Sequence, residues 1–229
     1  MAGRDKTAQK DCRSDLLRIY ELLNGHFGNL HWWPAEGPFE VMIGAILTQN
    51  TAWTNVEKAI AALKERRLLS PAAIDRTDEE TLAGVIRPSG YFRVKAKRLK
   101  SLVRFFLAEY GGNIEAMTAE ELPSLREKLL AVRGVGPETA DSILLYACGK
   151  PVFIGDAYTR RILHRHHRVP EEADVQQVRH LFMTHLPHDT SLFNQFHALF
   201  VHTGKTFCRT EPKCGRCPLR MLDSETVNP

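Results

Sequence analysis

The sequence predicts an all-α fold, because apolar residues recur at helical spacing in nearly every segment. A second observation agrees, since no stretch shows the strict apolar-polar alternation of a half-buried strand. Glycine and proline residues stand where the periodic segments end. The 229 residues are 43% hydrophobic and 25% charged, as expected for a globular protein of one domain or two lobes.

Ten segments have the spacing of helices, and the first begins at Ser14, an N-cap candidate, and ends near Gly25. The apolar run 38–50 is compatible with a buried strand, but the next segment continues at helical spacing, so we expect a buried helix. A turn divides the fourth segment into two short helices, the second started by Thr77 or Asp78. The ten segments are 14–25, 38–50, 51–66, 70–87, 91–110, 118–132, 137–150, 156–169, 175–186 and 191–208.

The charge pattern is mildly basic. The net charge of +4 is compatible with a polyanionic partner. We interpret the basic run at 93–104 as a solvated helix face, the usual fate of such a run: Arg93, Lys95, Lys97, Arg98, Lys100 and Arg104. No apolar stretch approaches the roughly 20 residues of a membrane span, and the N-terminus lacks the apolar core of a signal peptide. We therefore expect a soluble, cytoplasmic protein with no membrane partner.

The segment "RGVGPETAD" at 133–141 predicts a phosphate-binding turn between two helices. Gly134 and Gly136 permit unusual backbone angles and close approach, so that backbone N–H groups can face an oxyanion. Pro137 is favoured at a helix start, where the helix dipole is positive. The simpler alternative is an αα-hairpin whose glycines only make a tight turn. We favour DNA phosphate binding by the turn, with these contributors: Arg133, Gly134, Val135, Gly136 and Thr139.

At this point a family resemblance emerges. The stretch "RGVGPETADSILLYACGKPVFIGDAYTRRIL" resembles the motif of the helix-hairpin-helix Gly/Pro–Asp DNA glycosylase superfamily, which includes endonuclease III. "GAILTQNT" resembles the early active-site segment of that family. The resemblance implies a two-lobed fold: a six-helix lobe at 36–147 and a second lobe from 1–35 and 148–229. It also implies a monomer that acts on damaged double-stranded DNA in base excision repair.

Asp156 follows Gly155 and precedes a helical segment, so it is placed as an N-cap. Amides that donate to a carboxylate hold it ionised, and a fixed carboxylate stabilises an oxocarbenium-like transition state or orients water. The resemblance implies this catalytic role for Asp156. Relatives that also cut the DNA backbone carry a lysine where this chain has Glu138. An acid cannot form a Schiff base, so we expect a glycosylase without lyase activity, in which Glu138 orders the pocket or a water.

All three tryptophans lie near the early segment, as Trp32, Trp33 and Trp53. Core packing is the usual fate of any one of them. Their arrangement resembles the subgroup called 3-methyladenine DNA glycosylase III, in which stacked aromatics hold the alkylated base. A cationic N3-methylated adenine suits such π faces. By the same resemblance Gln49 fills the gap left in the duplex, with an ordinary polar residue as the alternative, and Asn50 lines the pocket mouth.

The cysteines Cys208, Cys214 and Cys217 form a C-x5-C-x2-C loop that predicts metal ligands. Endonuclease III-like proteins hold a [4Fe–4S] cluster in a similar loop, and here Asp223 stands at the position of their fourth cysteine. Three readings stay open: a cluster with an incomplete cysteine set, zinc, or no metal at all.

The expected activity is hydrolysis of the N-glycosidic bond of an alkylated purine such as 3-methyladenine in duplex DNA. One alternative is an endonuclease III-type activity on oxidised pyrimidines, which the cysteine loop favours and Glu138 disfavours. The other alternative is a non-catalytic helix-hairpin-helix module that only binds DNA.

Overall fold

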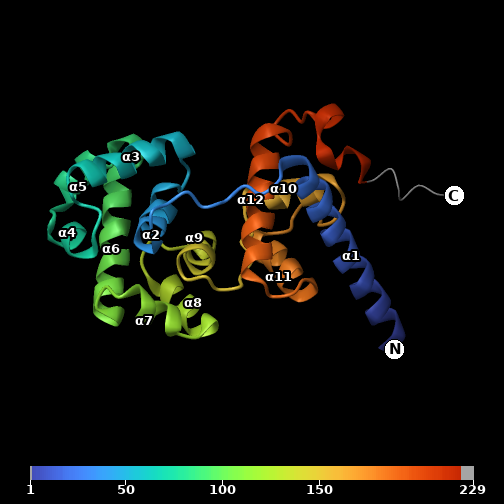
Figure 1. The fold of residues 1–229 in the computed structure, drawn as a ribbon, viewed down its shortest axis with the longest axis horizontal. Coiled ribbons are helices and arrows are strands. Elements are labelled where there is room, and N and C mark those ends of the chain that lie inside the picture. Colours follow the sequence, from blue (N-terminus) through green and yellow to red (C-terminus); the bar gives the residue numbers. More distant parts are fainter. Residues whose placement is uncertain (1, 223–229) are drawn as a thin grey trace. The chain divides into compact units, whose positions relative to one another are not determined.

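The computed structural model describes the backbone of residues 2–222 and the side chains of residues 11–222. The chain divides into unit 1, which combines Met1–Trp32 with Pro151–Pro229, and unit 2, which is Trp33–Lys150 (Figure 1). Within residues 2–222 every regular element is helical, so the predicted all-α class is confirmed. None of the described helices is long and apolar enough to cross a bilayer.

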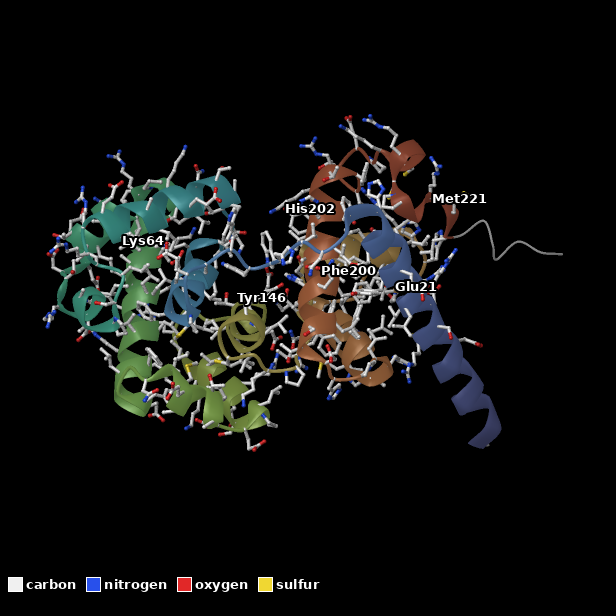
Figure 2. The ribbon with its side chains drawn as sticks, in the orientation of Figure 1. Glu21, Lys64, Tyr146, Phe200, His202 and Met221 are labelled. Atoms are coloured by element: carbon white, nitrogen blue, oxygen red, sulfur yellow. The ribbon has the colours of Figure 1, made fainter. Side chains whose placement is uncertain are left out.

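Unit 1 packs around a cluster of phenylalanines. The rings of Phe153 and Phe182 stack with centroids 3.7 Å apart. Phe196 stacks at 4.9 Å on Phe200, which is labelled in Figure 2. Burial of each ring contributes about 1.5–3 kcal/mol. The elements of unit 1 are α1 (Ala2–Phe27), α10 (Ala157–Arg165), α11 (Val175–His185), α12 (Thr190–Thr206), η3 (Cys214–Arg216) and η4 (Pro218–Met221).

The first helix is longer than the sequence suggested. It begins at Ala2 rather than at Ser14, and it ends at Phe27, where Gly28 takes a left-handed φ of 68°. The residues before Ser14 include good helix formers, which extend an existing helix without needing a buried face. The buried stripe comes later, from Leu16, Ile19 and Leu23, and α1 packs with it against α11 and α12.

Unit 2 is organised around α6, which packs against α2, α4, α5 and α7. The expected buried helix in 38–50 is confirmed, since α2 is buried from Val41 to Leu47. Asp78 caps α5 by accepting a hydrogen bond from the Thr81 N–H at 2.9 Å. The elements are α2 (Pro38–Leu47), α3 (Trp53–Glu65), α4 (Pro71–Arg76), α5 (Glu79–Val85), η1 (Arg87–Ser89), α6 (Phe92–Tyr110), α7 (Ile114–Ala119), α8 (Leu122–Ala131), α9 (Pro137–Ser142) and the π-helical η2 (Ile143–Ala147).

The reading of the basic run as a solvated face is wrong for two of its six members. Lys95 and Lys100 are 1% and 5% exposed. The Lys100 ammonium donates to Asp75 O at 2.8 Å and to Thr77 O, at the C-terminal end of α4. Carbonyls at a helix C-terminus have no intrahelical partner and carry the negative end of the dipole, so a buried lysine is stabilised there.

Candidate functional site

The glycine turn of the sequence joins α8 to α9 in unit 2. Gly134 has a left-handed φ of 93°, and a Cβ there would lie 2.2 Å from Cγ of Arg98. Gly136 has an ordinary φ of −91°, and a Cβ there would meet nothing within 4 Å. The two glycines therefore serve different needs: Gly134 is required by the fold, whereas Gly136 leaves open space over the N-terminus of α9.

Gln49 is tied to this turn by its carboxamide. Its Nε2 donates to Gly134 O at 3.1 Å and to the Thr139 hydroxyl at 2.9 Å, and its Oε1 accepts from the Arg98 guanidinium. The structure thus brings Gln49 beside the hairpin residues, although 85 positions separate Gln49 from Gly134. Its predicted role in filling the duplex stays a prediction.

The loop after α2 is held by Lys95. The ammonium donates to Leu47 O at 2.7 Å, Ser89 O at 2.7 Å and the Thr51 hydroxyl at 2.6 Å. Burial, and secondarily Arg98, lowers the pKa of Lys95 to about 8, so the side chain keeps all three N–H donors at neutral pH. This clamp fixes the strained loop in which exposed Asn50 has a φ of 51°.

A buried ion pair holds the two hairpin helices together. Arg126 on α8 donates two hydrogen bonds to Asp141 on α9, at 2.7 and 3.2 Å, and Asp141 is 1% exposed. Glu138 lies one helical turn before Asp141 and is exposed in the first turn of α9, where an acid suits the helix dipole. Arg133 is also exposed, while Val135 and Thr139 are buried.

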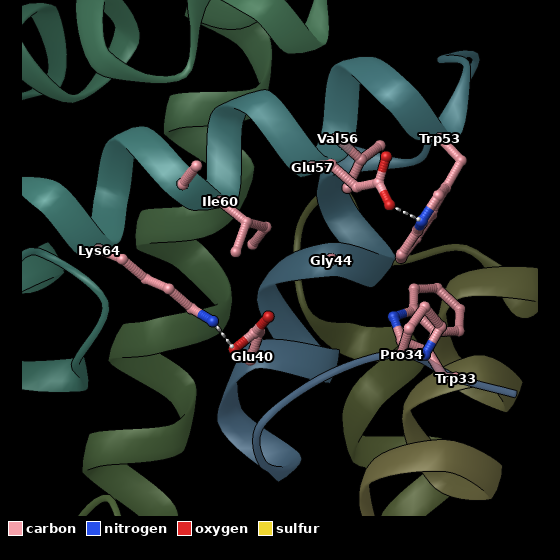
Figure 3. Close-up of a pocket in the computed structure, with 10 residues that line it drawn as sticks. Trp33, Pro34, Glu40, Gly44, Trp53, Val56, Glu57, Ile60 and Lys64 are labelled. Atoms are coloured by element: carbon pink, nitrogen blue, oxygen red, sulfur yellow. Dashed lines mark hydrogen bonds and ion pairs between the residues drawn. The ribbon is translucent and has the colours of Figure 1, made fainter. Parts of the chain in front are cut away.

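Two of the three tryptophans border a pocket in unit 2 with a volume of about 210 Å³ (Figure 3). The rings of Trp33 and Trp53 meet edge to face, with centroids 5.0 Å apart and planes at 85°. Trp33 also lies 5.2 Å from the ring of Tyr146. Gly44 on α2 makes room for this indole, since a Cβ at Gly44 would lie 3.2 Å from Cζ2 of Trp33.

The third tryptophan, Trp32, belongs to unit 1. Its ring lies 5.7 Å from the Lys205 ammonium of α12, within range of a cation–π interaction. Burial lowers the pKa of Lys205, and the Asp156 carboxylate opposes that shift. Trp32 is therefore placed with residues of unit 1 rather than among the pocket residues of unit 2.

Asp156 is the N-cap of α10, as predicted. Its Oδ1 accepts a hydrogen bond from the Thr159 N–H at 2.7 Å, and the residue is 4% exposed. The imidazole Nε2 of His197, on α12, lies 3.6 Å from Oδ2. Burial alone raises the pKa of Asp156, but the contacts from His197 and Thr159 outweigh burial and hold the pKa below its ordinary value. The result is an ionised carboxylate in a mostly apolar unit.

The cysteine loop is anchored to α10 by arginines. Arg161 donates to Cys208 O at 2.8 Å, and Arg165 donates to Cys208 Sγ at 3.3 Å. Cys208 and Cys217 are buried and Cys214 is exposed. Within residues 11–222, no three His, Cys, Asp or Glu side chains are gathered closely enough to hold a metal ion. Asp223 lies outside the described residues, so the described residues do not complete the expected ligand set.

Sequence reasoning missed four side chains at these places. Glu57 and Tyr146 border or contact the tryptophans of unit 2, and His197 and Lys205 surround Asp156 and Trp32 in unit 1. Only Glu57 carried a signal, because it lies four positions after Trp53 and therefore on the same face of a helix. The other contacts join residues that are distant in sequence.

Comparisons with known proteins agree on one family. Residues 43–188 match the model of the HhH-GPD superfamily of base excision DNA repair proteins. A Methanocaldococcus jannaschii protein provisionally named a DNA repair glycosylase (MJ1434) is 44% identical over 90% of this chain and 94% of its own length. Endonuclease III of Thermotoga maritima is 31% identical over 80% of this chain and 81% of its own.

A solved structure extends the likeness to three dimensions. The crystal structure of Helicobacter pylori 3-methyladenine DNA glycosylase (MagIII) bound to 1,N6-ethenoadenine matches with a TM-score of 0.67 and 29% identity. The match covers 87% of this chain and 96% of that one.

Proposed function

Because this chain belongs to the HhH-GPD superfamily and is a DNA glycosylase of base excision repair, we propose that its substrates are alkylated purines in duplex DNA. The observation that carries the proposal is the pocket of unit 2, whose walls include the indoles of Trp33 and Trp53. A glycosylase extrudes its target nucleotide and binds the base by stacking, and electron-rich ring faces favour a cationic base. The similar MagIII structure, which holds 1,N6-ethenoadenine, supports this choice.

The chemical step is assigned to Asp156. As the bond between the base and C1′ lengthens, positive charge builds on the deoxyribose, and an ionised carboxylate stabilises that charge. The same carboxylate can accept a proton from the attacking water. An alkylated cationic purine leaves as a neutral base, so no acid is required to protonate it. Asp156 suits this role because its contacts keep it ionised despite burial.

We assign contact with the DNA backbone to the hairpin turn between α8 and α9. Backbone N–H groups beside Gly134 and Gly136 and the guanidinium of Arg133 would hold one phosphate without reading the sequence. The open space at Gly136 supports this assignment. Gln49, held beside the turn, would fill the gap that the extruded nucleotide leaves in the duplex. Asn50 joins Trp33 and Trp53 as a proposed base-binding residue, whereas Trp32, which belongs to unit 1, is left out of the pocket.

We assign the reaction to hydrolysis without strand cleavage, because position 138 carries a carboxylate where a lyase needs an amine. Glu138 then orders a water or the pocket. Borohydride trapping on DNA that contains an abasic site tests this assignment. A covalent adduct between the protein and DNA would contradict it.

A metal in the cysteine loop would be structural, with Cys208, Cys214 and Cys217 as ligands, and no step above depends on it. Visible absorption of anaerobically purified protein reports an iron–sulfur cluster, and elemental analysis reports zinc.

The substrate proposal is tested by base release. Wild-type protein should release base from methylated DNA and not from thymine-glycol DNA. The reverse result would support the second candidate, an activity on oxidised pyrimidines, which the likeness to endonuclease III favours. Asp156→Asn should lose base release by about 10²–10⁴-fold and keep DNA binding. Unchanged release would remove Asp156 from the chemistry.

A further inference from the structure

The pocket of unit 2 carries a charged side chain, Glu57, that has no part in the chemistry or the DNA contacts proposed above. We infer that the carboxylate of Glu57 makes this pocket select a positively charged, N3-methylated adenine over neutral adenine. The inference rests on the proposed function, because it assumes that the pocket receives the damaged base. It adds a specificity-determining residue to that function.

The size of the pocket limits what can enter it. About 210 Å³ is smaller than the roughly 300 Å³ at which most ligand sites begin. A single planar ring system is therefore a better occupant than a whole nucleotide. Because Trp33 and Trp53 lie at 85° to each other, they offer no parallel sandwich, and a base that stacks on one indole faces other groups on its remaining sides.

Three charged side chains line the pocket, and two of them neutralise each other. Lys64 lies 2.9 Å from Glu40 (Figure 3). Lys64 also pairs with Glu36 at 2.8 Å. Glu57 accepts a hydrogen bond from the Trp53 indole N–H at 3.0 Å. Among residues 11–222 no lysine, arginine or histidine lies within ion-pair distance of Glu57. The pocket wall therefore carries net negative charge, and Glu57 is its uncompensated carboxylate.

This charge has two effects on a bound cation. The carboxylate attracts the cation directly, and the attraction grows when the base displaces water from the pocket. The hydrogen bond from Trp53 to Glu57 also places negative charge at the indole edge, which strengthens the attraction of the ring face for a cation. A neutral base gains neither effect.

A purely structural role for Glu57 is the competing explanation, since the same hydrogen bond fixes the orientation of Trp53. Glu57→Gln separates the two, because glutamine keeps an oxygen acceptor for the indole N–H and removes only the charge. Glu65→Gln is the matched control, since Glu65 is an exposed acid on the same helix outside the pocket.

The test is equilibrium binding of two free bases, followed by tryptophan fluorescence. The probes are 3,9-dimethyladeninium, a permanent cation, and 9-methyladenine, its neutral counterpart. Wild type should prefer the cation. Because Glu57 is exposed to solvent, Glu57→Gln should weaken cation binding about three- to fivefold, while neutral binding stays within about 1.5-fold. Glu65→Gln should match the wild type.

Equal losses for both bases would overturn the inference and leave Glu57 as a support for Trp53. An unchanged preference in Glu57→Gln, or no cation preference in the wild type, would also overturn it. Failure of the proposed function has a different signature. In that case the pocket discriminates between the two bases, but the protein releases no base from methylated DNA.

Discussion

The imidazole Nε2 of His197 lies 3.6 Å from the Oδ2 of Asp156, and both residues are buried in unit 1. They come from different helices, since Asp156 caps α10 and His197 lies within α12. The packing of α10 against α12 thus helps to keep the Asp156 carboxylate ionised.

The first prediction concerns this pair. Because His197 helps to hold the pKa of Asp156 below its ordinary value, His197→Gln should raise that pKa. The acidic limb of kcat/KM for base release should then move to higher pH, with DNA binding retained. The measurement is single-turnover base release as a function of pH. His202→Gln, an exposed histidine on the same helix, is the control. A uniform rate loss at all pH values would mean that His197 only fills space.

The two glycines of the hairpin should separate folding from binding. Gly134→Ala combines a left-handed φ with a collision against Arg98, so we expect a loss of about 1–3 kcal/mol in unfolding free energy. Gly136→Ala should leave the unfolding free energy within about 0.5 kcal/mol, because its Cβ meets nothing, yet it should weaken DNA binding. Denaturant titration and DNA binding at one salt concentration check both. Full DNA affinity in Gly136→Ala would argue against phosphate binding at the turn.

Lys95 should contribute to the stability of the fold through its three hydrogen bonds. Lys95→Met removes three hydrogen bonds and leaves the carbonyls of Leu47 and Ser89 without this donor, so unfolding free energy should fall by about 2–4 kcal/mol. Lys97→Met, at an exposed position of the same helix, should change it by less than about 0.5 kcal/mol. Urea denaturation compares the two variants. Equal unfolding free energies for Lys95→Met and Lys97→Met would show that the hydrogen bonds of Lys95 do not stabilise the fold.

The contacts of Glu120 should make the protein less stable as the pH falls into the acidic range. Hydrogen bonds from Ser124 and Tyr110, and the ion pair with Lys128, lower the pKa of Glu120 to about 2. The folded-state pKa lies below the unfolded value, so the stabilisation is complete above the unfolded pKa of about 4.5 and is lost as pH falls toward 2. Glu120→Gln should lower Tm by about 2–4 °C at neutral pH and by less in acid. A difference that does not change with pH would contradict the assignment.

Much of the architecture was readable in the sequence because its signals are local. Helical periodicity and the capping aspartates Asp78 and Asp156 each depend on neighbours within a few residues. The prediction of a solvated face for the basic run was wrong at Lys95 and Lys100, because their charge alone does not reveal the distant carbonyls to which they donate. The predicted helix start at Ser14 was wrong, because a serine can lie inside a helix and the residues before Ser14 also favour a helix.

The candidate site divides in the same way. The hairpin turn and the tryptophans stood out by their residue types and spacing. His197 pairs with Asp156, and Gln49 pairs with Gly134. Both pairs join positions that are far apart in the chain, so the pattern of neighbouring residues does not predict them. Glu57 was overlooked because its importance comes from the neutralisation of Glu40 by Lys64, which is a property of the folded pocket.

Unit 1 is assembled from both ends of the chain, and this has a consequence for biosynthesis. The apolar stripe of α1 is synthesised well before its partner α12, which begins only at Thr190. At cellular translation rates the stripe waits on the order of ten seconds, while all of unit 2 is made and can fold. During that interval Leu16, Ile19 and Leu23 lack the α12 surface that buries them in the folded protein, so the core of unit 1 is completed only after synthesis has passed Thr190.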